Sequence, residues 1–364
     1  MAGIYIHIPF CKSRCIYCGF YSTTALDLRQ RYVEALCREV QMRPSSSPLS
    51  TIYLGGGTPS QLTIEQLRLV FEAIYKYNKV EPDAEVTIEV NPDDVTPDFA
   101  SALKDLPVNR VSMGAQTFDD QRLHWLRRRH TSSQVSQAVL LLRQAGIQNI
   151  SIDLMYGFPQ ESLDDWRADI SQALALHVEH ISAYCLMIEE GTPLYRMQLP
   201  ELDEELERQM YYTLIDRLEA AGYEHYEISN FARPGFHSRH NSSYWTGTPY
   251  VGIGAAAHSY DVRTRSWNVS DIRQYIEAIQ HDQRPYEEER IDADTRYNDM
   301  VTVALRTRKG LSLSSLTEAQ RTHCLKNAQH YLDTGLLVLS DDTLRLTREG
   351  LFVSDMIMSD LMMI

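Results

Sequence analysis

The stretch "GIYIHIPFCKSRCIYCGF", residues 3–20, joins a short apolar run to a loop that contains three cysteines. The run is rich in isoleucine and tyrosine, which favour a β-strand. Cys11, Cys15 and Cys18 follow with the spacing C-x3-C-x2-C, and Phe20 stands where one more cysteine would continue the series. A strand that leads directly into three soft metal ligands indicates a ligand-binding loop at the strand end.

The same order of a strand and a special loop recurs along the chain. Further strands are expected at 51–56, 85–90, 110–115, 150–157 and 180–187, and helices between them at 27–42, 61–77, 97–105, 132–145 and 163–177. The segments "GGGTPS", "NPDD", "QTFDD", "GFPQE" and "EEGTPL" follow the five later strands. This alternation predicts right-handed βαβ units and a parallel sheet, so we expect all these loops to meet at one rim.

The pattern changes in the last third of the chain. A helix is expected at about 203–222, and "YEHYEISNFARPG" and "SRHNSSYW" predict a strand and an ordered loop. After about residue 285 the order helix–helix–hairpin–helix predicts a small, mostly helical, winged-helix-like domain. We therefore expect two domains, residues 1–285 and 286–364, the second serving as a lid or a dimer surface.

Composition excludes several classes of function. The 364 residues carry a net charge of −14, and the densest basic cluster, "RRRH" at 127–130, is short. Such a surface repels nucleic acid, so no nucleic-acid partner is expected. No run of eighteen apolar residues occurs, which predicts no membrane span. The N-terminal segment lacks a basic leader, and we expect a cytoplasmic protein.

The three cysteines of the loop have three alternative uses. A structural zinc site usually takes four ligands in two pairs, and no second pair is present. A disulfide is disfavoured in the cytosol, and three is an odd number of cysteines. An iron–sulfur cube fits better, because three thiolates leave one iron open for another ligand. A zinc-bearing scaffold remains the alternative, decided by metal content.

At these residues the chain resembles the radical S-adenosylmethionine (SAM) superfamily. That resemblance implies a partial (β/α)6 barrel within the α/β class, with a [4Fe-4S] cluster on Cys11, Cys15 and Cys18. In the superfamily the open iron chelates the amino and carboxyl groups of SAM, and an electron cleaves SAM to methionine and a 5′-deoxyadenosyl radical. It also implies an electron donor such as flavodoxin or ferredoxin.

The motifs "YIHIPFC", "GGGTPS", "EVNPD", "GAQTFDD", "RRRHT" and "DLMYGFP" look like the coproporphyrinogen III oxidase-like branch of this superfamily. The resemblance implies a set of SAM-binding residues with distinct roles. Tyr5 would pack beside the cluster, Gly56, Gly57 and Thr58 would contact the methionine part, Glu89 its ammonium group, Arg128 its carboxylate, and Gln116 and Asp153 the ribose hydroxyls. These pairings are chemically sound, since a guanidinium suits a carboxylate and a carboxylate suits an ammonium group or a diol.

Two functions share this branch: an oxygen-independent oxidase that decarboxylates coproporphyrinogen III in haem synthesis, and a haem chaperone. The oxidase carries a further cysteine where this chain has Phe20, and a longer segment before the cluster loop. Both departures favour the chaperone group, with the oxidase as the alternative and catalytic turnover left open.

The downstream half is similar to the H-N-x-x-Y-W region of the chaperone group. His240 in "RHNSSYW" is the candidate haem ligand, with Tyr244 and Trp245 flanking the macrocycle; His7, His258 or a cysteine are alternatives. The resemblance implies haem as cargo and haem-acceptor proteins as partners, membrane respiratory enzymes among them. A position peripheral to the membrane is compatible with this role.

Two positions depart from the pattern of the branch. Gly19 follows the third cysteine, where we expect an acidic residue, and Arg127 stands at a place often held by glycine. Neither is expected to contact the cofactors directly, although Gly19 could change the hydrogen bonding of the cluster.

Overall fold

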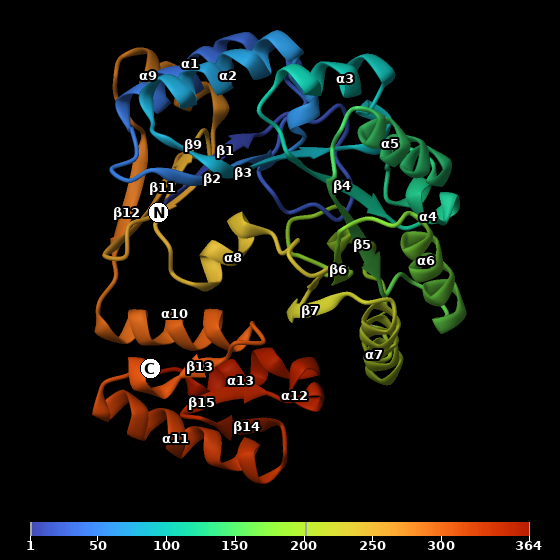
Figure 1. Cartoon of the computed structure of the whole chain (residues 1–364), viewed down its shortest axis with the longest axis vertical. Coiled ribbons are helices and arrows are strands. Elements are labelled where there is room, and N and C mark those ends of the chain that lie inside the picture. The colour runs from blue at the N-terminus through green and yellow to red at the C-terminus, as the bar shows by residue number, and fades with distance from the viewer. Residues whose placement is uncertain (1, 201, 364) are drawn as a thin grey trace.

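The computed structural model describes residues 2–200 and 202–363, and it is built around one large sheet (Figure 1). Six strands of this sheet run parallel and pair in chain order: β1 (Ala2–Ile8), β2 (Leu49–Gly56), β3 (Val80–Val90), β4 (Arg110–Gln116), β5 (Asn149–Tyr156) and β6 (His180–Cys185). These are the six strands that the sequence predicts. Their parallel order brings the loops that follow them to a common edge, as expected.

Helices cover the outer face of these strands (Figure 1). They are α1 (Arg29–Met42), α2 (Ile64–Tyr77), α3 (Pro97–Ala102), α5 (Ser132–Gln144) and α6 (Leu163–Ala175), with α7 (Glu204–Ala220) packed beside α6. Gly146 ends α5 with a φ of +92°, in the predicted C-terminal cap. A short helix, α4 (Asp120–Trp125), was not expected; it follows Asp119, whose carboxylate accepts from the amides of Gln121 and Arg122.

Further strands extend the sheet at both ends, and all their pairings except that of β9 with β1 are antiparallel. On one side β8 (Asn230–Ala232) pairs with β6, and β7 (Glu224–Glu227) pairs with β8. On the other side β9 (Tyr250–Ile253) runs parallel to β1, and β10 (His258–Tyr260), β11 (Thr264–Asn268) and β12 (Tyr286–Arg290) follow. In the described residues β12 and β7 stay at opposite ends of the order, so the sheet forms a partial barrel.

The segment "SRHNSSYW", expected to be an ordered loop, contains helix α8 (Arg239–Trp245). It lies on the inner side of the sheet (Figure 1). Ser238 accepts the amide of Asn241, and the Glu85 carboxylate of β3 accepts the amides of Arg239 and His240. These contacts satisfy the free amides of a helix too short to be stable alone. The loop prediction was wrong because a carboxylate distant in sequence stabilises the helix.

The C-terminal part has its own core and its own sheet. It contains α10 (Ala293–Leu305), α11 (Glu318–Asp333), α12 (Arg348–Phe352) and α13 (Ser354–Leu361), with β13 (Leu311–Ser312), β14 (Leu337–Ser340) and β15 (Thr343–Leu346) in the order β13-β15-β14. Its buried residues run from Tyr297 to Leu361 and are separate from the main core. The boundary at 285/286 stays a prediction, since β12 still belongs to the large sheet.

No helix among residues 2–200 and 202–363 is both long and apolar enough to cross a bilayer.

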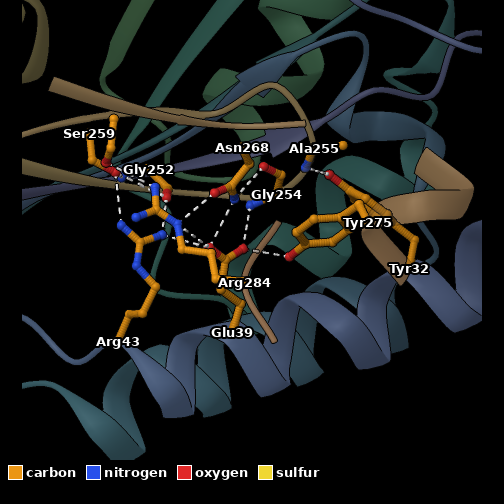
Figure 2. A network of polar contacts seen from close by, with 11 residues as sticks. Tyr32, Glu39, Arg43, Gly252, Gly254, Ala255, Ser259, Asn268, Tyr275 and Arg284 are labelled. Carbon is orange, nitrogen blue, oxygen red and sulfur yellow. Dashed lines mark hydrogen bonds and ion pairs between the residues drawn. The ribbon is translucent and has the colours of Figure 1, made fainter. Parts of the chain in front are cut away.

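A buried carboxylate ties α1 to the strands that extend the sheet (Figure 2). Glu39 is fully buried and accepts from Arg43 Nη1 at 2.6 Å, the Gly254 amide at 2.9 Å, Asn268 Nδ2 at 2.9 Å and the Tyr275 hydroxyl at 2.6 Å. Tyr275 lies on α9 (Ile272–Gln280). Since β9 pairs with β1, this network also holds the strand from which the cysteine loop starts.

We expect Glu39→Ala to lower the free energy of unfolding by about 3–5 kcal/mol, because it removes the buried acceptor shared by the half-buried Arg43 guanidinium, Asn268 Nδ2 and the Tyr275 hydroxyl. Urea unfolding of the full chain measures this change. Glu34→Ala, at an exposed position of the same helix, should change stability by less than about 0.5 kcal/mol. Equal effects of the two variants would contradict a role for the network.

Candidate cluster and cofactor site

The cysteine loop leaves β1 at the expected edge and is anchored on three sides. The Cys11 amide donates to the Thr23 carbonyl at 2.9 Å, the Ile16 amide to the Leu126 carbonyl at 3.2 Å, and the Leu194 amide to the Ile16 carbonyl at 2.9 Å. Ile16 itself is fully buried. The loop is thus held by Thr23 at its far end, by the segment after α4 and by the segment after β6.

The three thiols of this loop are all half-buried. Burial, with the other nearby thiols, raises the pKa of Cys11 and of Cys18. In the described residues, no three Cys, His, Asp or Glu side chains are grouped as the ligands of one metal ion. A cube would take one thiolate at each of three corners, and its irons would supply the positive charge that favours the thiolate form. The residues present therefore fit an iron–sulfur cluster.

The glycines after β2 are required by close contacts. Gly56 has a φ of +108°, and a Cβ there would lie 2.4 Å from the His7 ring. A Cβ at Gly57 would lie 2.7 Å from the backbone of Pro9. At Gly56 and Gly57 the backbone therefore lies directly against the start of the cysteine loop, with no room for a side chain between them. Thr58 completes the contact, with its hydroxyl 3.6 Å from Cys11 Sγ.

Glu89, the predicted partner of an ammonium group, is held by two donors. The Tyr53 hydroxyl donates to its Oε1 at 2.7 Å and the Gly56 amide to its Oε2 at 3.0 Å. Burial, together with the neighbouring charge of Asp153, raises the pKa of Glu89 to about 7. A buried carboxylate of this kind gains most from a cationic ligand. A cationic ligand would favour the ionised form of Glu89, and contact with the SAM ammonium group stays a prediction.

The two predicted ribose-binding residues lie on neighbouring strands. Gly114 of β4 pairs with Asp153 of β5, and the register shifts before Gln116, which has a φ of +68°. That φ is a strained conformation for glutamine, of the kind that occurs at functional sites. Burial raises the pKa of Asp153, and side-chain hydrogen bonds from Ser182 oppose the shift. Strand pairing thus brings both side chains to one end of the sheet.

Arg128 links the cysteine loop to the sheet. Its Nη1 lies 3.6 Å from Cys15 Sγ, and its Nη2 donates to Asn91 Oδ1 at 2.7 Å and to the Gly114 carbonyl at 2.6 Å. Its Nε is buried and has no hydrogen-bond partner in the described part of the chain. An open donor on a buried guanidinium suits a bound carboxylate.

Tyr5 and His240 lie deeper in the barrel, where their rings contact each other and Tyr53. His240 is 1% exposed, its Nδ1 lies 2.8 Å from the Thr51 hydroxyl, and its Nε2 lies 2.9 Å from the Tyr244 hydroxyl. Burial lowers its pKa to about 3, so the ring is neutral. Ligation of haem iron by His240 therefore remains a prediction, and it requires one of these two hydroxyls to move away.

Sequence reasoning missed two residues that organise this site. Tyr53 positions Glu89, and Asn91 joins Arg128 to the Thr58 hydroxyl, which its Nδ2 reaches at 3.3 Å. Asn91 lies inside the recognised motif "EVNPD", and Tyr53 lies in the expected strand 51–56, two residues before "GGGTPS". Their position at a strand end was the available signal, but which neighbour each side chain contacts depends on the strand pairing.

The two departures from the family pattern have structural counterparts. A Cβ at Gly19 would lie 1.9 Å from Glu189 Oε2, so a carboxylate from the loop after β6 occupies the space of a side chain at position 19. Arg127 has a φ of +60°, in the left-handed region. This conformation explains why glycine is common at its place.

The raised pKa of Glu89 makes a pH-dependent prediction for the protein without cofactors. The unfolded state loses this proton near pH 4.5 and the folded state only near pH 7, so this group destabilises the fold increasingly as pH rises through that window. Glu89→Gln should therefore increase the free energy of unfolding at pH 8 by up to about 3 kcal/mol relative to wild type, and not at pH 4.5. The variant should accordingly melt at a higher temperature than wild type at pH 8. Thermal unfolding at both pH values measures the gap, and the exposed control Glu72→Gln should show none.

A second prediction concerns the cysteines. After anaerobic reconstitution with iron and sulfide, Cys11→Ser, Cys15→Ser and Cys18→Ser should each lose most of the bound iron, because each removes one of three thiolate ligands. Iron and sulfide analysis with EPR measures the loss. Cys37→Ser, on α1 with its thiol donating to the Leu69 carbonyl, should retain the wild-type content. Zinc without iron or sulfide in the wild type would contradict the cluster.

Two protein-family models and several known proteins match this chain. Residues 5–173 match the Radical SAM superfamily, and residues 291–353 match the HemN C-terminal domain. A protein of Mycobacterium tuberculosis named heme chaperone HemW is 34% identical over 99% of this chain and 94% of its own length. The HemW proteins of Bacillus subtilis and Escherichia coli are 37% and 34% identical, over 87% and 70% of this chain and 86% and 69% of their own lengths.

Among solved structures, coproporphyrinogen III oxidase (HemN) of Escherichia coli superposes with a TM-score of 0.85. It is 21% identical, and the match covers 99% of this chain and 89% of that one. This likeness confirms the fold, a partial barrel followed by a C-terminal helical part. The radical SAM family to which the match assigns residues 5–173 implies a [4Fe-4S] cluster and SAM. This chain is 34% and 37% identical in sequence to two HemW proteins, over 99% and 87% of its length. It therefore belongs to the HemW family within the radical SAM superfamily.

Proposed function

We propose that this protein is a haem chaperone that carries a [4Fe-4S] cluster and SAM and delivers haem to acceptor proteins. The observation that carries the proposal is the end-to-end similarity to proteins named heme chaperone HemW. One residue of the cluster loop supports it independently. Phe20, at the place of the oxidase's further cysteine, is 72% exposed and contributes no ligand.

Different residues of the rim would bind the cluster and SAM. Cys11, Cys15 and Cys18 would hold the cluster, which when bound supplies an electron and an open iron for SAM. Glu89 would take the ammonium group, and the free Nε of Arg128 the carboxylate. Gln116 and Asp153 would accept from the ribose hydroxyls. Tyr53 and Asn91 would position these groups.

Partners follow from the same proposal. Haem is the cargo, membrane respiratory enzymes are candidate acceptors, and flavodoxin or ferredoxin is the candidate electron donor. A cytoplasmic place, with peripheral contact to the membrane during transfer, would allow both exchanges. The exposed apolar side chains Phe20, Met187 and Ile188 follow β1 and β6 at the rim, where a partner protein would approach.

We expect the purified chain to bind haem stoichiometrically at micromolar concentration, with a Soret band that serves as the measure. If His240 ligates the iron, His240→Ala should change this band. Tyr244→Phe should preserve the His240-dependent band, because it removes the hydroxyl next to Nε2. An identical spectrum for His240→Ala and wild type would exclude His240 as the ligand, and no uptake by wild type would contradict the chaperone function.

The alternative, an oxygen-independent coproporphyrinogen III oxidase, is favoured only by the fold of HemN. Anaerobic incubation with coproporphyrinogen III, SAM and a reductant distinguishes the two functions. The chaperone proposal expects no decarboxylated product, whereas repeated turnover to protoporphyrinogen would establish the oxidase.

A further inference from the structure

Arg110, the first residue of β4, carries a buried guanidinium group that none of the contacts described above uses. The residue is 1% exposed. Its Nε and Nη1 atoms are buried and have no hydrogen-bond partner among residues 2–200 and 202–363. A buried charge without a partner costs stability, so native proteins keep one only where nearby charges of opposite sign offset it. We therefore looked for negative charge around Arg110.

The residues beside Arg110 in the sheet do not supply this charge. Thr87 of β3 and Asn149 of β5 are its two neighbours in the strand register. Each has a buried side-chain oxygen, Thr87 Oγ1 and Asn149 Oδ1, and neither oxygen has a hydrogen-bond partner in the described part of the chain. The guanidinium group is thus not fixed to either neighbouring strand, and its counter-charge lies farther along the inner face of the sheet.

Two carboxylates occupy that inner face on the same two strands. Glu89 follows Thr87 by two residues, and Asp153 follows Asn149 by four. Side chains alternate between the two faces of a strand, so both carboxylates share the inner face with Arg110. Within the residues that the structure describes, Arg110, Glu89 and Asp153 form no ion pair. The barrel interior therefore holds a cation and two carboxylates that are not in direct contact.

These charges nevertheless act on one another. Burial raises the pKa of Glu89 to about 7; the charge of Asp153 adds to this rise, and the charge of Arg110 opposes it. Burial also raises the pKa of Asp153, while hydrogen bonds from Ser182 and the charge of Arg110 oppose that rise. Loss of the Arg110 charge would therefore make both carboxylates harder to ionise.

Neighbouring elements contribute several titratable side chains that face these three residues. They are Tyr5 of β1, Tyr53 of β2, His180 and Tyr184 of β6, Tyr226 of β7, and His240 and Tyr244 of α8. Burial lowers the pKa of both histidines and raises the pKa of each of these tyrosines. All of them are therefore neutral near pH 7, and none can replace the charge of Arg110.

The other charged groups near this cluster are already engaged. Arg128 donates to Asn91 and to the Gly114 carbonyl. Glu85 accepts the amides at the start of α8, and Glu227 pairs with Arg306. The Arg110 guanidinium thus remains as the cation whose charge is left to act on Glu89 and Asp153.

We propose that Arg110 is a positioning residue of the cofactor site, whose charge favours the ionised form of Glu89 and Asp153 inside the barrel. This inference rests on the proposed function, which assigns these two carboxylates to the ammonium group and the ribose of SAM. A direct ion pair would occupy the carboxylate oxygens, whereas a charge held at a distance leaves them free for the ligand. The separation of Arg110 from the two carboxylates then has a physical reason.

A double-mutant cycle on the cofactor-free full chain tests the coupling between these charges. Glu89→Gln should increase the folding constant at pH 9, and this gain should be about tenfold larger in the Arg110→Met background than in wild type. The reason is that the ionised Glu89 then lacks the charge that offsets its burial. At pH 4.5 the folded protein holds Glu89 protonated, so the two backgrounds should agree. Arg110→Lys keeps the charge and should behave as the wild-type background. Urea unfolding at both pH values measures the cycle.

Binding of SAM to the cluster-loaded chain tests the positioning role. Arg110→Met should weaken SAM binding about tenfold at pH 7 and less at pH 9, where both carboxylates ionise without the guanidinium group. Arg110→Lys should bind close to wild type. Arg273→Met, at an exposed arginine of α9, is the matched control and should have no effect. Equilibrium dialysis compares each variant with wild type at the same pH, so that the titration of SAM itself cancels.

Equal gains from Glu89→Gln in both backgrounds at pH 9 would overturn the inference, whatever the cofactors do. Equal weakening of SAM binding by Arg110→Met and Arg110→Lys at both pH values would also overturn it, because packing rather than charge would then be responsible. Arg110→Gln is the second uncharged variant if Arg110→Met does not fold. A wild type that shows the coupling but binds no SAM when loaded with the cluster would instead reject the cofactor part of the proposed function, while the charge role of Arg110 stands.

Discussion

Parallel pairing of β1 to β6 forces the segments that follow these strands to leave the sheet along one edge. This constraint brings together the cysteine loop, the glycines after β2, Glu89 near the end of β3 and Gln116 at the end of β4. These residues are far apart in sequence, and no local interaction could assemble them. Every cofactor contact proposed here depends on the register of these six strands. Two later strands, β9 and β8, pair with β1 and β6 at the two ends of this parallel set.

Two buried networks maintain the arrangement. Glu39 ties α1 to Gly254, directly after β9, and to Asn268 of β11, and so fixes the strands beside β1. Asn91 and Arg128 tie the loop after β3 to the end of β4 and to the cysteine loop. Both networks place charge in surroundings that raise the cost of any unpaired group. Their members therefore specify one geometry of the rim.

The same molecule separates two chemistries in space. The rim gathers thiols, glycines and carboxylates, which suit a metal cluster and a zwitterionic cofactor. A cavity beneath α8 gathers tyrosines and arginines. Tyr244, Tyr53 and His240 form a continuous aromatic contact between the two regions.

Strand and helix positions in the first half were predictable because apolar periodicity and glycine placement are local properties of the chain. Among the site residues, the structure brings Glu89, Arg128, Gln116 and Asp153 to the predicted edge, and their roles toward SAM remain proposals. Helix α8 was missed because Glu85, about 150 residues earlier, accepts its free amides. Tyr53 and Asn91 were missed because their partners are set by pairing between strands rather than by spacing.

The sequence by itself determined the parallel α/β fold, the edge where the candidate site lies and the three cysteines proposed to hold the cluster. Periodicity, strand-end motifs and cysteine spacing are properties of short segments, and short segments preserve them in any context. Only the tertiary structure decided that His240 is buried between two hydroxyls and that Glu189 fills the space beside Gly19. Those facts depend on contacts between segments more than one hundred residues apart or on the packing of separate elements, which no local pattern encodes.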